Sequence, residues 1–335
     1  MRFDFTDEQY ALRDATRRLL AAECDSAHLR AMWESATGRS PQLWKRMAET
    51  GLVGLTVPEE HGGLGSSEVD LVLLLEEAGY VALPEPLLET TAVAVPLLLE
   101  AGSEAQQAHW LPRIAVGEAV ATVQFAGDPV VADAHIADVL LAEREGELHA
   151  LPASAFHATP QPSIDRSRRL FTVDLATSAD TRMPGGAAEA ARAFDRAAAG
   201  SAAMLGGISQ RLLDMTVAHV REREQFGRPV GSFQAVKHKL AETLLLVETS
   251  KPACWYAAYV LAHDLPDRLE AASIAKAYAS DAAAKADQEA LQCHGGIGFT
   301  WEHDLHLWMK RATAMQRTYG SARWHRSRLA QTLLA

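Results

Sequence analysis

The segment Arg221–Glu242 (REREQFGRPVGSFQAVKHKLAE) concentrates residue types that could bind an anionic ligand. Gly227 permits a tight backbone turn, and Ser232 is placed to cap the helix that we expect to follow. Arg223 and Arg228 would then flank a helix N-terminus, where backbone N–H groups and guanidinium groups together favour a phosphate or a carboxylate. An ordinary connection between two helices, with solvated arginines, is the alternative that these residues leave open.

A second glycine-rich segment lies downstream, at Gln292–Phe299 (QCHGGIGF). Three glycines after a helix bring the backbone close to a ligand, and their N–H groups can bind phosphate oxygens. The same Gly-Gly-x-Gly pattern also occurs as a helix C-cap followed by a turn. Ligand binding and simple chain reversal are therefore both compatible with this segment when it is taken alone.

Together the two segments resemble the signatures of the acyl-CoA dehydrogenase family of flavoenzymes. The similarity lies in two ordered strings, Arg223–Gly227 (REQFG) with Phe233-Gln234, and Gln292–Phe299. The resemblance implies FAD as the cofactor, held at a boundary between subunits. It implies contacts to FAD from Arg223, Gln225, Phe226 and Gln234, and, toward the FAD of a neighbouring subunit, from Gln292, Gly295 and Gly296.

The catalytic base of that family is not found where the resemblance places it. The family removes the α-proton of an acyl thioester with a glutamate, while the β-hydrogen leaves as hydride to the flavin. In many members this glutamate precedes a glycine in the last long helical region, where this chain has Tyr319. An unperturbed tyrosine, with a pKa of about 10, is a poor base near neutrality. Other members carry the base early in the first bundle helix, where Asp195 is the nearest acid, so the base is absent, Asp195 or an acid that the resemblance does not identify.

Three further segments, Val139–Leu141, Ser163–Leu170 and His306–Ala312, resemble an actinobacterial subgroup of the family that works as pairs of unlike chains. In that subgroup one chain carries the catalytic carboxylate and the other contributes part of the FAD site, often for bulky or sterol-derived acyl-CoA. The resemblance therefore implies a base-deficient chain of an α2β2 heterotetramer in lipid metabolism. It also implies an acyl-CoA substrate, a homologous partner chain and an electron-transfer flavoprotein as acceptor.

Two other functions remain open at this point. The chain could be a self-sufficient, homo-oligomeric dehydrogenase of acyl-CoA or acyl-carrier-protein thioesters that uses Asp195 as its base. It could also be a non-catalytic structural subunit that keeps the fold. The chain keeps Arg223, Gln234 and Gln292, to which the resemblance assigns FAD contacts, and this argues against a structural subunit.

The elements that would position these residues are mainly helical. Residues 1–118 are predicted to form an N-terminal helical domain with Thr6 as its first cap, and residues 119–183 a small, abridged, β-barrel-like domain of five or six strands. Residues 184–335 are predicted to form a four-helix bundle. This part of the chain is rich in alanine, which favours helix, and Met183–Gly186 returns the chain to helix at its start. Its helices are expected at Glu189–Glu222, Phe233–His263, Leu269–Cys293 and Asp304–Leu333.

Composition narrows the class of protein. The 335 residues carry a formal net charge of -11, which disfavours a general nucleic-acid binder. Three cysteines without metal-ligand spacing argue against disulfides and a zinc site, so no metal is predicted. The apolar runs are shorter than the ~20 residues that span a bilayer, so we expect a cytoplasmic protein without a membrane segment. His294 is interpreted as a structural, hydrogen-bonded histidine.

Overall fold

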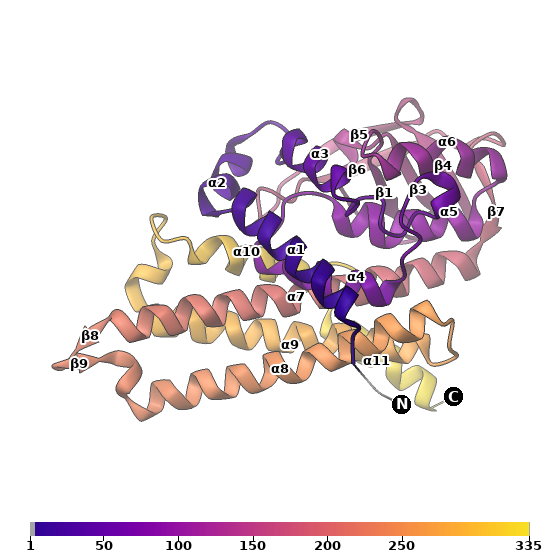
Figure 1. Ribbon diagram of the computed structural model, residues 1–335. Coiled ribbons are helices and arrows are strands. Elements are labelled where there is room, and N and C mark those ends of the chain that lie inside the picture. Colours follow the sequence, from indigo (N-terminus) through magenta and orange to yellow (C-terminus); the bar gives the residue numbers. More distant parts are fainter. Residues whose placement is uncertain (1–3, 335) are drawn as a thin grey trace. The chain divides into compact units, whose positions relative to one another are not determined.

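The computed structural model describes residues 4–334, which divide into two compact units. The first unit comprises the described residues up to Leu29, Val72–Leu83 and those from Ala198 onward, and the second comprises Arg30–Leu71 and Pro84–Ala197. The mainly α fold is confirmed, with a small β region between N-terminal helices and long C-terminal helices (Figure 1). The division into domains at 118/119 and 183/184 stays a prediction.

The first unit consists of helices and one short hairpin. Its elements, some of which continue into the second unit, are α1 (Asp7–Glu23), α2 (Ser26–Glu34), α4 (Glu68–Tyr80), α7 (Ala187–Glu222), β8 (Glu224–Gln225), β9 (Arg228–Pro229), η5 (Val230–Ser232), α8 (Gln234–Ala262), α9 (Arg268–His294), η6 (Gly295–Phe299), α10 (Leu305–Met315) and α11 (Ala322–Leu334). α1 begins as predicted, because Thr6 and Gln9 form a reciprocal capping box. α9 packs along α8 and against α11. Most of its buried residues are alanines, whose small side chains let these helices approach closely.

α4 and α7 cross with their backbones in contact. A methyl group built on Gly79 would lie 2.0 Å from the carbonyl oxygen of Met204. One built on Gly207 would lie 1.9 Å from the carbonyl oxygen of Glu76. No side chain can be accommodated at such distances, so glycine at both positions determines how closely the two helices pack.

The second unit holds the β region and the helices beside it. Its further helical elements are α3 (Pro41–Glu49), η1 (Glu59–His61), the π-helix η2 (Leu88–Ala94), α5 (Val95–Ala101), α6 (Glu104–Ala115), η3 (Ala134–Ile136) and η4 (Ala153–Ala155). Its strands are β1 (Ala121–Gln124), β2 (Val131–Ala132), β3 (Val139–Arg144), β4 (Glu147–Pro152), β5 (Phe156–Gln161), β6 (Leu170–Leu175) and β7 (Arg182–Gly186). They form two sheets, in the orders β1-β3-β4-β7 and β2-β6-β5, in which only β1 and β3 pair in parallel. Val131, Leu140, Leu151 and Phe171 are among the buried residues of its core.

The return to helix after Met183–Gly186 is confirmed, because α7 begins at Ala187. Met183–Gly186 itself lies in β7, which pairs with β4. Two local expectations were wrong. Ser232 is not a helix cap, because α8 begins after Phe233 without a side-chain capping bond. The helix expected over Asp304–Leu333 is interrupted between Met315 and Ala322. Within that break Tyr319 and Gly320 have φ of 54° and 92°, values that an α-helix cannot contain.

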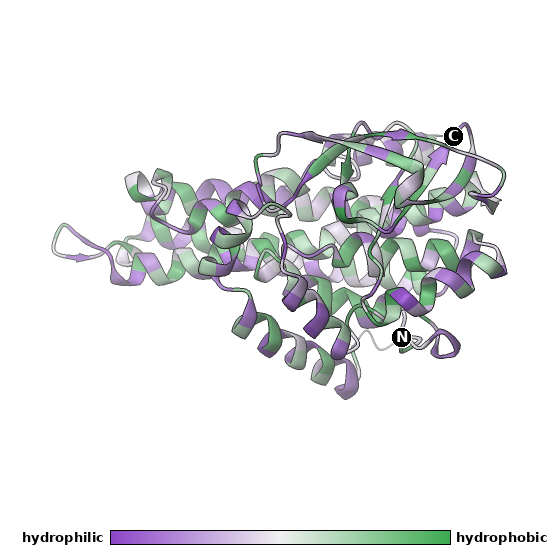
Figure 2. Cartoon of the chain, turned by 90° about the horizontal axis from the view of Figure 1, so that it is seen from above, coloured by the Kyte–Doolittle hydropathy of each residue, from purple (hydrophilic) through white to green (hydrophobic). Residues whose placement is uncertain are grey.

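The described part of the chain has no helix long and apolar enough to cross a membrane. Hydrophobic and hydrophilic residues are interleaved along the helices (Figure 2).

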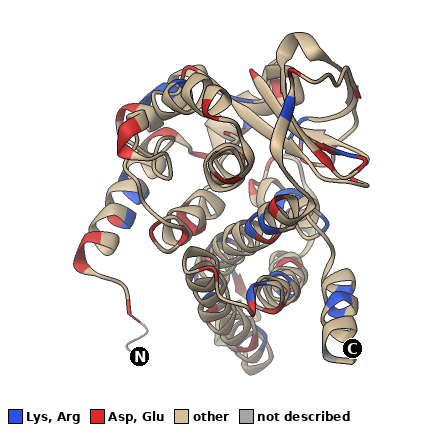
Figure 3. Ribbon diagram, turned by 90° about the vertical axis from the view of Figure 1, so that its right-hand side faces the viewer, with Lys and Arg blue, Asp and Glu red and all other residues tan. Residues whose placement is uncertain are grey.

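Acidic and basic residues are likewise mixed over most elements, whereas α11 carries arginines and no acid (Figure 3). A charge distribution of this kind keeps a bundle solvated without creating one dominant field.

The crossing of α4 and α7 can be tested with two adjacent glycines. Gly207→Ala places a methyl group against backbone, so we expect the free energy of unfolding to fall by more than about 3 kcal/mol. Gly206→Ala is the matched control, because a methyl group there meets no atom within 4 Å. The control should be neutral or slightly stabilising, since alanine favours a helix by about 1 kcal/mol over glycine. Equal unfolding midpoints in urea for the two variants would contradict this account.

Candidate functional site

The two predicted ligand-binding segments leave from neighbouring helix ends in the first unit. His219 lies in the last turn of α7 and His294 is the last residue of α9. Their imidazole rings stack with centroids 4.3 Å apart. The β8–β9 hairpin that follows α7 and the η6 turn that follows α9 therefore lie at the same end of the bundle, as Figure 1 also shows. The structure thus brings together segments that are far apart in sequence.

The β8–β9 hairpin presents Phe226 to solvent in a strained conformation. Phe226 and Gly227 form the two-residue turn, with φ of 54° and 76°. Positive φ at both central positions is typical of a type I′ hairpin, but a bulky aromatic residue there is unusual and costs about 1 kcal/mol or more. The Phe226 side chain meets the Phe233 ring edge-on with centroids 6.2 Å apart, yet it stays 92% exposed and so gains little burial within this chain. Strain of this kind is characteristic of positions that contact a ligand or a partner.

The two arginines of the hairpin have different surroundings. The Arg228 guanidinium lies 4.1 Å from the centre of the Phe233 ring, a cation–π contact. Arg223 is exposed beyond the end of α7, where its carbonyl accepts the Val230 N–H at 2.7 Å and closes the hairpin. Gln225 and Gln234 are also exposed. A fixed backbone with extended, solvent-facing donors suits an anionic ligand.

The start of α8 strengthens this anion-binding arrangement. Phe233 precedes the helix and supplies no side-chain cap, so no serine oxygen occupies the first N–H groups of α8. Uncapped N–H groups at a helix N-terminus attract negative charge. Because Ser232 does not cap the helix, those N–H donors are available to a ligand.

The η6 turn is open on its outer side. Gly295 and Gly296 are exposed, and a methyl group built on either would meet no atom within 4 Å. Gln292 is exposed as well, and Phe299 is 77% exposed. Unobstructed glycine backbone with an amide and an aromatic side chain nearby can approach a phosphate and an aromatic ring. These donors fit a dinucleotide cofactor.

The segment around Tyr319 is fixed by buried polar contacts of its carbonyl groups. The fully buried Lys276 donates from Nζ to the Met315 carbonyl at 2.5 Å. His325, also fully buried, donates from Nε2 to the Tyr319 carbonyl at 2.8 Å. Burial lowers the pKa of His325 to about 4, which keeps this ring neutral. Tyr319 itself is buried, and the role of Lys276 had no signal in the sequence.

Asp195 lies in the second unit and is 1% exposed. It stands on α7 between Phe194, which packs edge-on against Phe125 at 5.3 Å, and Arg196. The Arg196 guanidinium bonds to Glu68 at 2.6 Å and to Glu100 at 2.5 Å. Arg196 therefore has two carboxylate partners besides its sequence neighbour.

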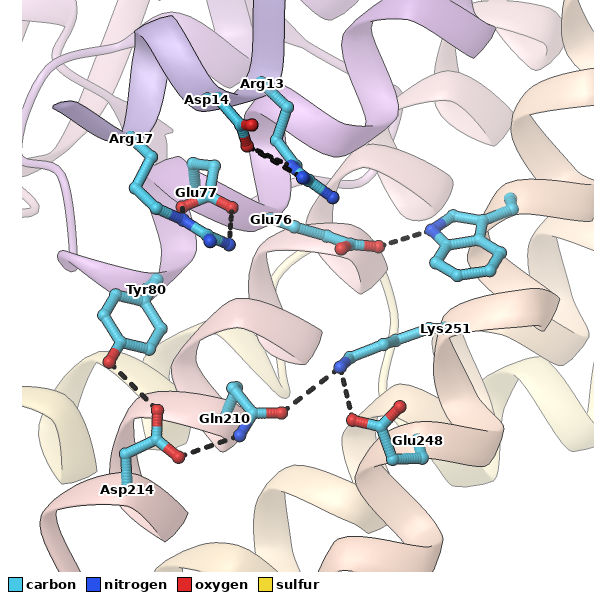
Figure 4. A network of polar contacts seen from close by, with 11 residues as sticks. Arg13, Asp14, Arg17, Glu76, Glu77, Tyr80, Gln210, Asp214, Glu248 and Lys251 are labelled. Carbon is cyan, nitrogen blue, oxygen red and sulfur yellow. Dashed lines mark hydrogen bonds and ion pairs between the residues drawn. The ribbon is translucent and has the colours of Figure 1, made fainter. Parts of the chain in front are cut away.

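A second polar cluster in the first unit lies around a cavity of about 350 Å³ (Figure 4). Tyr80, Asp214, Gln210 and Lys251 form a continuous chain of hydrogen bonds along one side. Glu76 accepts the Trp255 indole N–H at 2.6 Å. Desolvation raises the pKa of Glu76 to about 7. Because these groups satisfy one another, the cluster connects α4, α7 and α8 and does not present a free ligand site.

Comparisons with known proteins cover both ends of the chain. The family model of the acyl-CoA dehydrogenase N-terminal domain matches residues 6–118, and that of the C-terminal domain matches residues 185–334. The chain is 35% identical to the acyl-CoA dehydrogenase IpdE2 of Mycolicibacterium smegmatis over 333 residues, which cover 97% of this chain and 98% of that protein. It is 34% identical to IpdE2 of Mycobacterium tuberculosis over 307 residues, 91% of each chain.

Solved structures share the fold. A chain of the ChsE4-ChsE5 complex from Mycobacterium tuberculosis superposes with a TM-score of 0.92 at 24% identity, over 100% of this chain and 99% of that one. A chain from a variant of the Tcur3481-Tcur3483 steroid ACAD superposes with a TM-score of 0.90 at 26% identity, over 98% of each chain.

The environment of Glu76 predicts a pH-dependent stability. The folded chain binds this proton more tightly than the unfolded chain, because burial raises the pKa from 4.5 to about 7. The stabilisation is therefore complete below pH ~4.5 and is lost as the pH rises through ~7, by up to about 3 kcal/mol. Glu76→Gln should reduce the slope of the unfolding free energy against pH across this interval, whereas Glu248→Gln, at the exposed end of the cluster, should keep it. If urea titrations give the same slope of unfolding free energy against pH for the wild type and for Glu76→Gln, this assignment is refuted.

Proposed function

The chain belongs to the acyl-CoA dehydrogenase family, and from this premise we propose that it is the base-deficient subunit of a hetero-oligomeric dehydrogenase. As a family member it is an FAD-dependent oxidoreductase that acts on the CH–CH group of an acyl thioester. The proposal concerns what this chain contributes to that reaction. Its main support is the absence of any acidic residue after Asp304, which includes the whole segment around Tyr319.

The cofactor residues of the proposal are those that face solvent at the α7 and α9 ends. Arg223 and the uncapped N-terminus of α8 would carry the charge of the pyrophosphate, with Gln225 and Gln234 as further donors and Phe226 against a ring. Gln292, Gly295 and Gly296 would reach the FAD of a neighbouring subunit. When bound, the flavin supplies the acceptor for the β-hydride of the substrate.

The base is the part of the reaction that this chain lacks. Abstraction of the α-proton requires a group that is deprotonated near neutral pH, and Tyr319 offers only a phenol. The tyrosine lies buried in a turn whose carbonyls are bonded to Lys276 and His325. We infer that Tyr319 has a structural role and that a homologous partner chain supplies the carboxylate.

Association with a partner is supported by the exposed aromatic and aliphatic side chains beside the cofactor residues. Phe226 is 92% exposed, Phe299 77%, Trp301 50% and Ile297 48%. Apolar side chains gathered beside polar donors are typical of surfaces that a partner covers. An α2β2 heterotetramer would cover them and would complete each flavin site.

The names of the relatives support a proposal for the substrate class. One structural relative at 26% identity is described as a steroid ACAD with two differently named chains, and the relatives at 34% and 35% identity are acyl-CoA dehydrogenases. We therefore propose a bulky, sterol-derived acyl-CoA as substrate and an electron-transfer flavoprotein as electron acceptor. The alternative of a homo-oligomeric enzyme that uses Asp195 rests on the burial of that carboxyl on α7.

Co-expression tests whether the base lies in this chain. We expect the chain alone to reduce no flavin with acyl-CoA, and the complex with a homologous, glutamate-bearing chain to turn over. Asp195→Asn and Tyr319→Phe in the complex should each retain activity within about threefold, because neither group is the base. A loss of about a thousandfold in kcat for Asp195→Asn, with flavin still bound, would instead support the self-sufficient enzyme. A complex without a flavin absorbance band would favour a structural subunit.

Charge at the hairpin can be tested independently of turnover. Arg223→Gln should weaken FAD binding by roughly tenfold to a hundredfold, because a hydrogen bond to a charged group contributes about 1.5–3 kcal/mol. Arg221→Gln is the matched control, since Arg221 is an exposed arginine of the same helix end. The measurement is flavin retained per complex after dialysis against a series of FAD concentrations. Equal retention in both variants would remove Arg223 from the site.

A further inference from the structure

Three histidines converge at the end of the bundle that carries the cofactor segments. His219 lies on α7, His294 ends α9, and His303 lies in the connection to α10. Each offers a ring nitrogen, and these nitrogens all lie within 4.8 Å of one another. His303 meets His294 edge-on with ring centroids 4.8 Å apart. Gly298 packs against His294, so the η6 turn closes over one side of the group.

Among the described residues, nothing pairs with one ring nitrogen of the buried His294. Its Nδ1 donates to the Ala290 carbonyl at 2.7 Å, so its other nitrogen, Nε2, carries the lone pair. That Nε2 atom is buried and has no hydrogen-bond partner among the described residues. The residue as a whole is only 6% exposed. Because a buried acceptor without a partner is unfavourable, its burial beside two further imidazoles requires an explanation.

We propose that His219, His294 and His303 bind a divalent transition-metal ion of the zinc type. Neutral imidazole is a preferred ligand of Zn²⁺, and three histidines with a solvent molecule complete a four-coordinate shell. A metal-bound histidine commonly donates its second ring N–H to a backbone carbonyl, as His294 does to Ala290. This site uses none of the residues assigned to FAD and goes beyond the dehydrogenase reaction.

Binding requires defined side-chain movements. Zn–N distances of about 2.0–2.1 Å in a tetrahedral site place ligand nitrogens about 3.4 Å apart, so the present nitrogens must approach by roughly 1.4 Å. The half-buried ring of His219 must turn out of its stack with His294. His303 now accepts the Leu305 N–H through Nδ1 at 3.1 Å. Coordination through either of its nitrogens gives up that bond, because a neutral imidazole has a single lone pair.

The expected consequence is a cross-link between three helix ends. A metal ion bound by the three histidines would hold α7, α9 and the start of α10 together, directly before Gly295 and Gly296. We expect metal to raise the thermal unfolding midpoint of the chain and to protect the η6 amides from hydrogen exchange. Both readouts are independent of dehydrogenase turnover.

The test uses the full chain, with its partner chain where that is needed for solubility, after treatment with a chelator. Titration with ZnCl₂ against a chromophoric chelator should show about one tight site per chain, and CoCl₂ should give the intense visible bands of four-coordinate cobalt. His219→Gln, His294→Gln and His303→Gln should each weaken zinc binding by about tenfold or more. The matched control is His238→Gln, an exposed histidine of α8.

Two results would overturn the proposal. The first is an unchanged zinc affinity: His219→Gln and His303→Gln, both at half-buried positions, would bind zinc within about threefold of the His238→Gln control. The other is a cobalt spectrum of the weak, six-coordinate kind in the unmodified chain. Metal-free melting curves of each variant show whether it folds, and the flavin absorbance of the same samples reports separately on the proposed cofactor site.

Discussion

The backbone contact between α4 and α7 at Gly79 and Gly207 is the constraint on which the first unit depends. It brings α4 close enough for Glu76 to reach Trp255 on α8. It also directs the C-terminal end of α4 toward α10, where the Tyr80 carbonyl accepts the Trp308 indole N–H at 2.8 Å. The Leu83 carbonyl accepts the Arg311 guanidinium at 2.6 Å. These two hydrogen bonds hold α10 against the end of α4. In addition, Lys276 of α9 donates to the Met315 carbonyl in the last turn of α10. A close helix crossing of two glycines thus fixes the turn that contains Tyr319.

The cofactor end of the bundle depends on a different balance. Phe226 adopts positive φ and exposes its ring, Arg223 projects into solvent, and α8 begins without a side-chain cap. Positive φ at Phe226 costs free energy while its ring stays exposed beside Phe233, and the first N–H groups of α8 lack a side-chain acceptor. A bound dinucleotide and a second subunit would supply the missing contacts. This reasoning links the local strain of the hairpin to the assembly that we propose.

The sequence predicted most of the helices because their signals are local. The capping box at Thr6 and the alanine-rich run of α9 require no knowledge of distant residues. The break at Tyr319 was missed because it depends on Lys276 and His325, which contact the turn only in the folded chain. β7 was missed for a related reason, since its pairing with β4 is a tertiary contact. The proposed cofactor residues were predicted from an ordered string, whereas the histidine group has no string to recognise. Its members lie on separate elements and meet only through packing.

The surroundings of position 319 bear on the base-deficient chain that we propose. Tyr319 adopts positive φ, which is unfavourable for every residue with a Cβ atom, tyrosine and glutamate alike. Burial, with Lys276 and Arg328 nearby, lowers the pKa of the neighbouring His325. The same positive surroundings would stabilise a carboxylate as an anion and so weaken it as a base. A single Tyr319→Glu replacement therefore does not recreate a desolvated, reactive carboxylate. The conformation and the charges of the turn are consistent with a chain whose base resides in another polypeptide.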